Sequence, residues 1–157
     1  MTQTVSRDIA ASPEAVWELV SDITRIGDWS PECYRCEWDA GQVPGLGATF
    51  TGYNRFGDTE WSNRSTIVEW VPLERVAWEV RLTGRAAEKF GSNAATRWGF
   101  TIERIVTGAR LSQVTDDMRS EELKAVGAKF LPEIPDRAQR NLETMEATLA
   151  AIAADCE

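Results

Sequence analysis

Residues 138–152, AQRNLETMEATLAAI, carry the most regular hydrophobic pattern in this protein. Apolar side chains recur there at alternating steps of four and three residues, namely Ala138, Leu142, Met145, Leu149 and Ile152. This spacing predicts an amphipathic helix of about five turns that buries one face against a core. Pro132 and Pro135 lie just upstream of the predicted helix.

The centre of the chain has a different pattern, in which apolar and polar residues alternate between turn residues. From about residue 33 to 118 this alternation predicts a run of antiparallel strands. The alternation is most regular over 76–82 and 97–103, where large apolar side chains alternate with polar ones, as in a strand with one solvent-exposed face. Over 60–70 two adjacent residues are both apolar, so either a β-bulge interrupts the strand or both faces are partly covered. A polar loop is expected over 84–93.

The N-terminal segment predicts a strand followed by helices. Residues 4–10 are rich in β-branched side chains, which favours a strand. Ser12, Pro13 and Glu14 then supply an N-cap, a proline in the first turn and a first-turn acid, so a helix begins there. The order of elements predicts one α+β domain over 1–157. In it, a curved antiparallel sheet of about seven strands wraps around the long C-terminal helix, with two short helices after the first strand.

Composition excludes several classes of function. Histidine is absent, which removes Ser-His-Asp, Cys-His and His-based zinc sites. Acidic residues outnumber basic ones by 25 to 17, and a surface with net charge −8 repels phosphate backbones, so no nucleic-acid partner is expected. The N-terminus has no apolar signal-peptide core, and no apolar run reaches about eighteen residues. We therefore expect no membrane insertion and a cytoplasmic location.

Metal and cofactor motifs are not found in the sequence. Acidic pairs such as Glu121-Glu122 lack the spaced oxygen ligands of a calcium loop. The glycines at Gly41, Gly45 and Gly47 lack the Lys-Ser/Thr that completes a phosphate-binding loop. We therefore expect neither a metal nor a cofactor.

Two of the three cysteines, Cys33 and Cys36, form a C-x-x-C. This spacing suggests redox or metal chemistry, but a zinc site needs further Cys or His ligands that the sequence does not offer. A redox C-x-x-C also lies between the end of a strand and the start of a helix, whereas this one is followed by strand-like sequence. We interpret the pair as two strand cysteines, with a redox pair as the alternative.

Short motifs along essentially the whole chain carry a family resemblance. They are Val5-x-Arg7-x-Ile9, Ala11-Ser12-Pro13-Glu14-Ala15-Val16-Trp17, Ile26-Gly27-Asp28-Trp29-Ser30-Pro31-Glu32, Gly47-x-x-Phe50-x-Gly52-x-Asn54, Glu69-x-x-Pro72, Ala77-Trp78-Glu79-Val80 and Thr144 to Ile152. Together they resemble the polyketide cyclase/dehydratase-type branch of the SRPBCC superfamily, also called the START or helix-grip fold. That superfamily binds lipids, hormones and polyketides and includes enzymes, without an invariant catalytic constellation. Residues 119–135, part of which is compatible with a short helix, match it least well and lie where a lid over the cavity mouth would be.

In such a fold the inward-facing side chains line a cavity between the sheet and the C-terminal helix. By strand parity and helix pattern we expect ligand contacts from Trp29, Tyr34, Trp38, Phe50, Asn54, Trp78, Trp98, Phe100, Gln113, Leu142, Met145 and Leu149. Large flat rings suit an apolar or aromatic ligand, and Asn54, Gln113 and the phenol of Tyr34 would orient it. The alternative is that the rings fill the core and the polar groups hydrogen-bond within it.

Three hypotheses for function follow. The leading one is binding of a hydrophobic small molecule, such as a lipid, a polyketide or an aromatic metabolite, in that cavity. The second is an enzyme of cyclase, aromatase or dehydratase type, with Tyr34, Glu69 or Asp117 as acid or base in place of histidine. The third is a module that binds a partner by its outer surface. The sequence leaves open whether the protein is a monomer or a homodimer.

Overall fold

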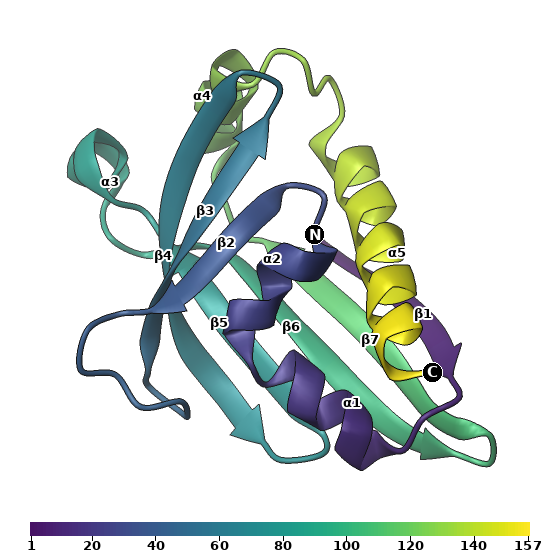
Figure 1. Cartoon of the computed structure of the whole chain (residues 1–157). Coiled ribbons are helices and arrows are strands. Elements are labelled where there is room, and N and C mark those ends of the chain that lie inside the picture. The colour runs from purple at the N-terminus through teal and green to yellow at the C-terminus, as the bar shows by residue number, and fades with distance from the viewer.

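A computed structural model describes all residues from 1 to 157 and shows a curved sheet with a long helix laid across its concave face (Figure 1). The strands are β1 (Thr2–Ile9), β2 (Cys33–Trp38), β3 (Thr49–Phe56), β4 (Thr59–Val71), β5 (Arg75–Arg81), β6 (Ala94–Ile105) and β7 (Gly108–Asp117). The helices are α1 (Pro13–Val20), a 3-10 turn (Ile23–Arg25), α2 (Ile26–Trp29), α3 (Gly84–Phe90), α4 (Glu121–Phe130) and α5 (Arg137–Cys156).

All seven strands form one antiparallel sheet in the order β1-β7-β6-β5-β4-β3-β2. The predicted α+β class, the strand number and the long C-terminal helix are therefore confirmed. The polar loop expected over 84–93 is wrong in part, because α3 occupies most of that segment. None of the helices combines the length and apolarity needed to span a bilayer.

The ambiguity over residues 60–70 is resolved by a β-bulge. The pairing of β4 with β5 shifts between Ile67 and Glu69. Ile67 lies opposite Trp78 and is buried, whereas Glu69 lies opposite Ala77 on the outer face. The extra residue thus allows both ends of a long strand to place apolar side chains on the inner face.

The long helix packs along β1 and β7 on one flank and against α1 and α2 on the other. Asp136 caps its first turn by accepting a hydrogen bond from the Gln139 N–H at 3.1 Å. Its C-terminal end is anchored by the Trp29 indole, whose Nε1 donates to the Asp155 carboxylate at 2.7 Å. α5 thus covers one margin of the sheet, and the inner faces of the middle strands are covered by side chains from elsewhere.

The short helix α2 is held against β2 by a close approach at Gly27. A Cβ atom at Gly27 would lie 2.5 Å from the Tyr34 carbonyl oxygen of β2. We predict that Gly27→Ala lowers the free energy of unfolding by about 2 kcal/mol, because backbone must move to admit the methyl group. Urea denaturation followed by tryptophan fluorescence measures the change.

The matched control is Gly127→Ala in α4. A Cβ there meets only the end of the flexible Arg119 side chain, at 2.9 Å. Alanine also favours helix over glycine by up to about 1 kcal/mol, so this variant should be at least as stable as wild type. Equal losses in the two variants would contradict the close-approach explanation.

Candidate ligand-binding site on the concave face of the sheet

Strand pairing fixes which side chains face the helix α5. Trp78 of β5 lies opposite Trp98 of β6, and Phe100 of β6 lies opposite Gln113 of β7. Trp78, Phe100 and Gln113 are buried, and Trp98 is half-buried against the core. The predicted inward orientation of these four side chains is therefore confirmed.

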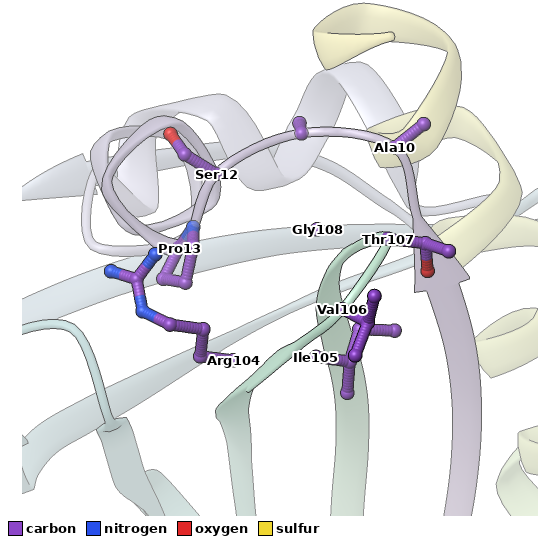
Figure 2. Close-up of a pocket in the computed structure, with 9 residues that line it drawn as sticks. Ala10, Ser12, Pro13, Arg104, Ile105, Val106, Thr107 and Gly108 are labelled. Atoms are coloured by element: carbon purple, nitrogen blue, oxygen red, sulfur yellow. The ribbon is translucent and has the colours of Figure 1, made fainter.

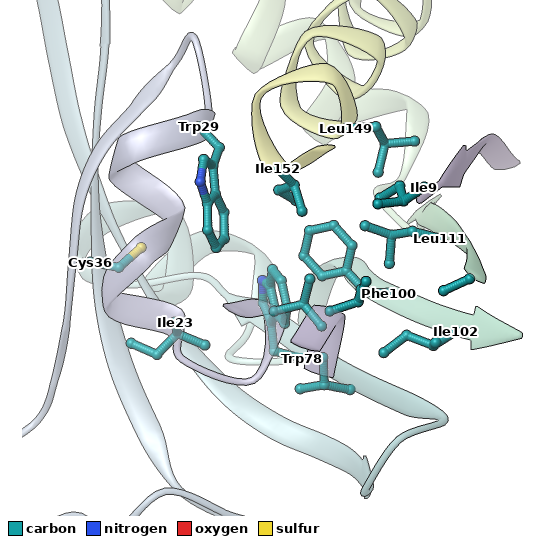
Figure 3. Close-up of a cluster of buried hydrophobic side chains, with 14 of the residues drawn as sticks. Ile9, Ile23, Trp29, Cys36, Trp78, Phe100, Ile102, Leu111, Leu149 and Ile152 are labelled. Atoms are coloured by element: carbon teal, nitrogen blue, oxygen red, sulfur yellow. The ribbon is translucent and has the colours of Figure 1, made fainter. Parts of the chain in front are cut away.

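A row of aromatic rings crosses this inner face from β2 to β6, at Trp38, Phe50, Trp78 and Phe100. Successive ring centroids lie 5.8, 5.7 and 6.1 Å apart. All but the first ring are buried in the main hydrophobic cluster, together with Leu149 and Ile152 from the C-terminal half of α5 (Figure 3). At this end of the face, the rings fill the core.

Further along the same strands, the inner face is only half-buried. The inward-facing residues that keep partial exposure there are Asn54 of β3, Trp61 and Asn63 of β4, and Thr96 and Trp98 of β6. These residues face the interior of the fold and still reach solvent, so this part of the sheet is less completely covered than the aromatic row. We call these five residues, with Gln113 and Thr115 of β7 beside them, the concave-face site.

Gln113 is the most informative polar residue of the concave-face site. Its side chain is 7% exposed, and the amide Oε1 is buried without a hydrogen-bond partner. An unpaired buried acceptor destabilises a protein by about 1–3 kcal/mol. A bound molecule could bond to this amide after rotation of the side chain, which would turn the covered oxygen toward the site.

The N-terminal half of α5 carries two of the predicted ligand residues, Leu142 and Met145. Met145 is fully buried yet lies outside the main hydrophobic cluster, and Leu142 is half-buried. Leu149, one turn further on, belongs to the filled core. A ligand contact of Leu142 or Met145 stays a prediction.

An ionic contact closes one side of the site, and sequence reasoning missed it. Arg137 in the first turn of α5 donates to both carboxylate oxygens of Glu32, at 2.9 and 3.1 Å, and the Glu32 side chain is only 12% exposed. One turn later the Arg140 guanidinium lies 5.0 Å from the centroid of the Phe56 ring of β3. These contacts tie α5 to the β2–β3 margin of the sheet.

The helix α4 borders the site at one point. Phe130 meets Trp61 of β4 edge-on, with ring centroids 6.0 Å apart. No residue of α4 is buried, and Phe130 itself is 51% exposed. The helical expectation for part of 119–135 is confirmed, and the function of this segment as a lid stays a prediction.

The predicted inward position of Tyr34 is wrong. Pairing between β2 and β3 shifts between Cys33 and Arg35, so Tyr34 sits in a bulge. Its ring is 40% exposed, 6.4 Å from the Tyr53 ring and 4.8 Å from the Arg55 guanidinium. Tyr34 therefore belongs to an exposed aromatic and arginine cluster on the outer face.

The two candidate carboxylates are held in ion pairs. Glu69 lies on the outer face, bound by Arg97 and, at 3.0 Å, by Arg75. Asp117 lies at the inner rim of β7 opposite Thr96, where burial acts to raise its pKa. Hydrogen bonds from the Arg119 guanidinium and backbone outweigh that effect and hold the pKa of Asp117 below its usual value. Nowhere do three or more Cys, Asp or Glu side chains gather in a way that could hold a metal ion.

Trp29 also differs from its predicted ligand-contacting position. It is 4% exposed, and its indole N–H is already paired with Asp155. The Arg25 guanidinium lies 5.2 Å from its ring centroid. Trp29 is thus an anchor between α2 and α5 within the core.

Two hollows on the surface lie outside the space between the sheet and α5. One, of about 560 Å³, is broad and open and lies between the β1–α1 connection and the β6–β7 turn (Figure 2). The other, of about 130 Å³, opens on the outer face, where Glu69, Arg75 and Arg97 border it. Of the predicted ligand residues, Trp98 and Phe100 of β6 border the second hollow, and the others line neither.

Comparisons with known proteins agree with this architecture. The family model described as polyketide cyclase/dehydrase and lipid transport matches residues 2–157. A polyketide cyclase-like protein of Corynebacterium glutamicum is 30% identical, with a TM-score of 0.63 over 97% of this chain and 88% of that one. A major latex-like protein of Panax ginseng is 13% identical, with a TM-score of 0.72 over 99% of this chain and 97% of that one. The search among curated proteins gives no match.

A fourth likeness is to the di-domain ARO/CYC protein StfQ of the steffimycin biosynthetic pathway. It is 12% identical, with a TM-score of 0.72, and 99% of this chain corresponds to 50% of that protein. At such identities the ginseng and steffimycin proteins show a shared fold alone. The family match, by contrast, covers nearly the whole chain, and the sheet and long helix form the helix-grip arrangement that the motifs indicated. This chain therefore belongs to the polyketide cyclase/dehydrase and lipid transport family of the SRPBCC superfamily.

Proposed function

We propose that this protein binds an apolar small molecule, of lipid, polyketide or aromatic type, at the concave-face site. The observation that carries the proposal is the half-buried state of inward-facing side chains on β3, β4 and β6, next to a fully packed aromatic core. Trp61 and Trp98 offer flat apolar surfaces there, and Asn54 and Asn63 offer polar groups. With Thr96, Gln113 and Thr115, five of the seven residues of the site are polar, so it is more polar than most small-molecule sites and suits a ligand that carries a polar group beside its apolar body.

The amide of Gln113 is a polar group for which no hydrogen bond within the protein is found. Rotation of this amide presents either its oxygen or its nitrogen to the site, and a hydroxyl group on a ligand can bond to both, because it donates and accepts. The net charge of −8 also disfavours strongly anionic molecules. We therefore favour a neutral ligand with an aromatic or alicyclic body and one hydroxyl group.

Catalysis has less support than binding. Of the three proposed acid or base residues, Tyr34 and Glu69 lie on the outer face and only Asp117 faces inward. Burial acts to raise the pKa of Asp117, but its hydrogen bonds with Arg119 keep the pKa below the usual value. The Asp117 carboxyl group is therefore ionised near neutral pH and cannot donate a proton. A cyclase or dehydratase activity and a surface interaction function both stay predictions.

Filling the concave-face site should weaken binding. We predict that Thr96→Trp weakens the affinity for the neutral fluorophore N-phenyl-1-naphthylamine roughly tenfold or more, equivalent to at least about 1.4 kcal/mol. The added indole would occupy the inner face of β6 beside Trp98. Titration of probe fluorescence measures the dissociation constant, and circular dichroism checks the fold.

The matched control is Thr101→Trp on the same strand. Thr101 lies opposite Arg75 and Ser112 on the outer face and is likewise half-buried. This variant should bind the probe as wild type does. Undiminished binding by folded Thr96→Trp, or equal losses in both variants, would place the probe elsewhere and count against the proposal.

Gln113→Leu tests the polar contact separately. The substitution removes an unpaired buried acceptor, so the free energy of unfolding should stay the same or rise by up to about 1 kcal/mol. Affinity for 2-naphthol should fall roughly fivefold to tenfold, because one hydrogen bond is lost, while affinity for naphthalene should not change. Calorimetric titration compares the two probes, and an equal change for both would mean that Gln113 affects only the shape of the site.

A further inference from the structure

The two cysteines of the C-x-x-C lie side by side in the folded protein. In a regular strand, residues three apart face opposite sides. Here the bulge between Cys33 and Arg35 turns both thiols to the inner face of β2, and their sulfurs are 3.3 Å apart. Both cysteines lie on a strand, as expected, and their thiols share one face of it.

Local hydrogen bonds hold this arrangement. The Ser30 hydroxyl accepts from the N–H of Cys33 at 3.0 Å and from that of Glu32 at 3.3 Å, which fixes the chain where it enters β2. Opposite the pair on β3 stands Gly52, and a Cβ there would lie 3.5 Å from the Cys36 sulfur and 3.7 Å from the Cys33 sulfur. The two thiols therefore sit together over a strand position that has no side chain.

The two thiols have unequal surroundings. Cys36 is 5% exposed within the main hydrophobic cluster, whereas Cys33 is half-buried at the edge of the sheet. A hydrogen bond from the Cys36 S–H lowers the pKa of Cys33 below its usual value, although burial opposes it. The same hydrogen bond, together with burial, raises the pKa of Cys36 far above its usual value. Cys33 is thus the thiol that solvent and small molecules can reach, and Cys36 is its buried neighbour.

We propose that Cys33 and Cys36 are a redox-active dithiol, which a low-molecular-weight disulfide converts into a Cys33–Cys36 disulfide. The Cys33 thiolate attacks one sulfur of that disulfide, its S–S bond breaks, and one half leaves as a thiolate. Cys36 then attacks the Cys33 sulfur, its proton passes to the second departing thiolate, and the intramolecular bond forms. The two protein thiols lose two electrons in total, and the small disulfide is reduced to two thiols.

This dithiol is independent of the proposed ligand, although it adjoins the same site. Cys33 lies opposite Asn54, which belongs to the concave-face site. Oxidation would join the two ends of the bulge on the edge strand β2. The chemistry nevertheless requires only the two thiols and the small disulfide.

Treatment of the reduced full-length chain with glutathione disulfide tests the proposal. Mass spectrometry after alkylation should show wild type without a label on Cys33 and Cys36, which are joined with the loss of two hydrogens, and with no glutathione retained on either. Cys36→Ser should instead trap glutathione on Cys33, roughly tenfold or more faster than on Cys156, whose thiol donates to the Ile152 carbonyl oxygen and has a pKa raised by burial. If the serine is not tolerated in the core, Cys36→Ala replaces this variant, and the expected result is then a trapped adduct on Cys33 without the rate advantage, because alanine cannot supply the hydrogen bond that lowers the pKa of Cys33.

Two controls test whether the reactivity comes from the folded arrangement of Cys33 and Cys36 or is that of any exposed thiol. Cys33→Ser should leave Cys36 unreacted in the folded protein, and urea should abolish the difference between Cys33 and Cys156. A stable glutathione adduct on wild-type Cys33 without the internal disulfide would overturn the proposal. So would equal rates at Cys33 and Cys156 in the folded Cys36→Ser variant.

Discussion

One helix is too narrow to cover a sheet of seven strands, and the rest of this structure follows from that mismatch. Neighbouring strands lie about 4.8 Å apart, so the sheet is about 29 Å wide, whereas a helix with its side chains is about 10 Å across. α5 packs along β1 and β7, and α1 and α2 add contacts near its C-terminal half. The inner faces of β3 to β6 must be covered by something other than α5.

The protein covers this surface differently at its two ends. Near the C-terminal half of α5, the rings of Phe50, Trp78 and Phe100 reach across and close the core. Near the N-terminal half, the strands carry amides, threonines and two half-buried tryptophans. The gap there is spanned by the ion pairs of Glu32 with Arg137 and Arg140 and by the Arg140–Phe56 contact. Polar side chains cannot complete an apolar core, so the composition of the strands sets where the packing stops.

The sequence predicted most of this architecture because its hydrophobic patterns are regular where the structure is regular. Clean alternation around Trp78 and Phe100 placed both rings correctly, and the spacing of α5 identified its buried face. The error at Tyr34 arises at a bulge, where one inserted residue reverses the alternation of faces along the strand. The second bulge, between Ile67 and Glu69, lies where the alternation is irregular and left the orientation of residues 60–70 open. The pairing of Glu32 with Arg137 joins residues 105 positions apart, and no local pattern reports such a contact.

The position of β1 has a consequence for how the chain acquires its structure. β1 is the first strand in the sequence, yet its sole neighbour in the sheet is β7, with Thr2 opposite Asp116 and Ile9 opposite Ala109. On a ribosome, this strand emerges long before its partner exists and cannot pair until the last strand has left the exit tunnel. Such distant pairing raises the contact order and slows folding relative to helical domains of similar length. Throughout that interval, the apolar inner side of the growing sheet lacks α5, so nascent chains depend on rapid completion or on chaperones to avoid association with one another.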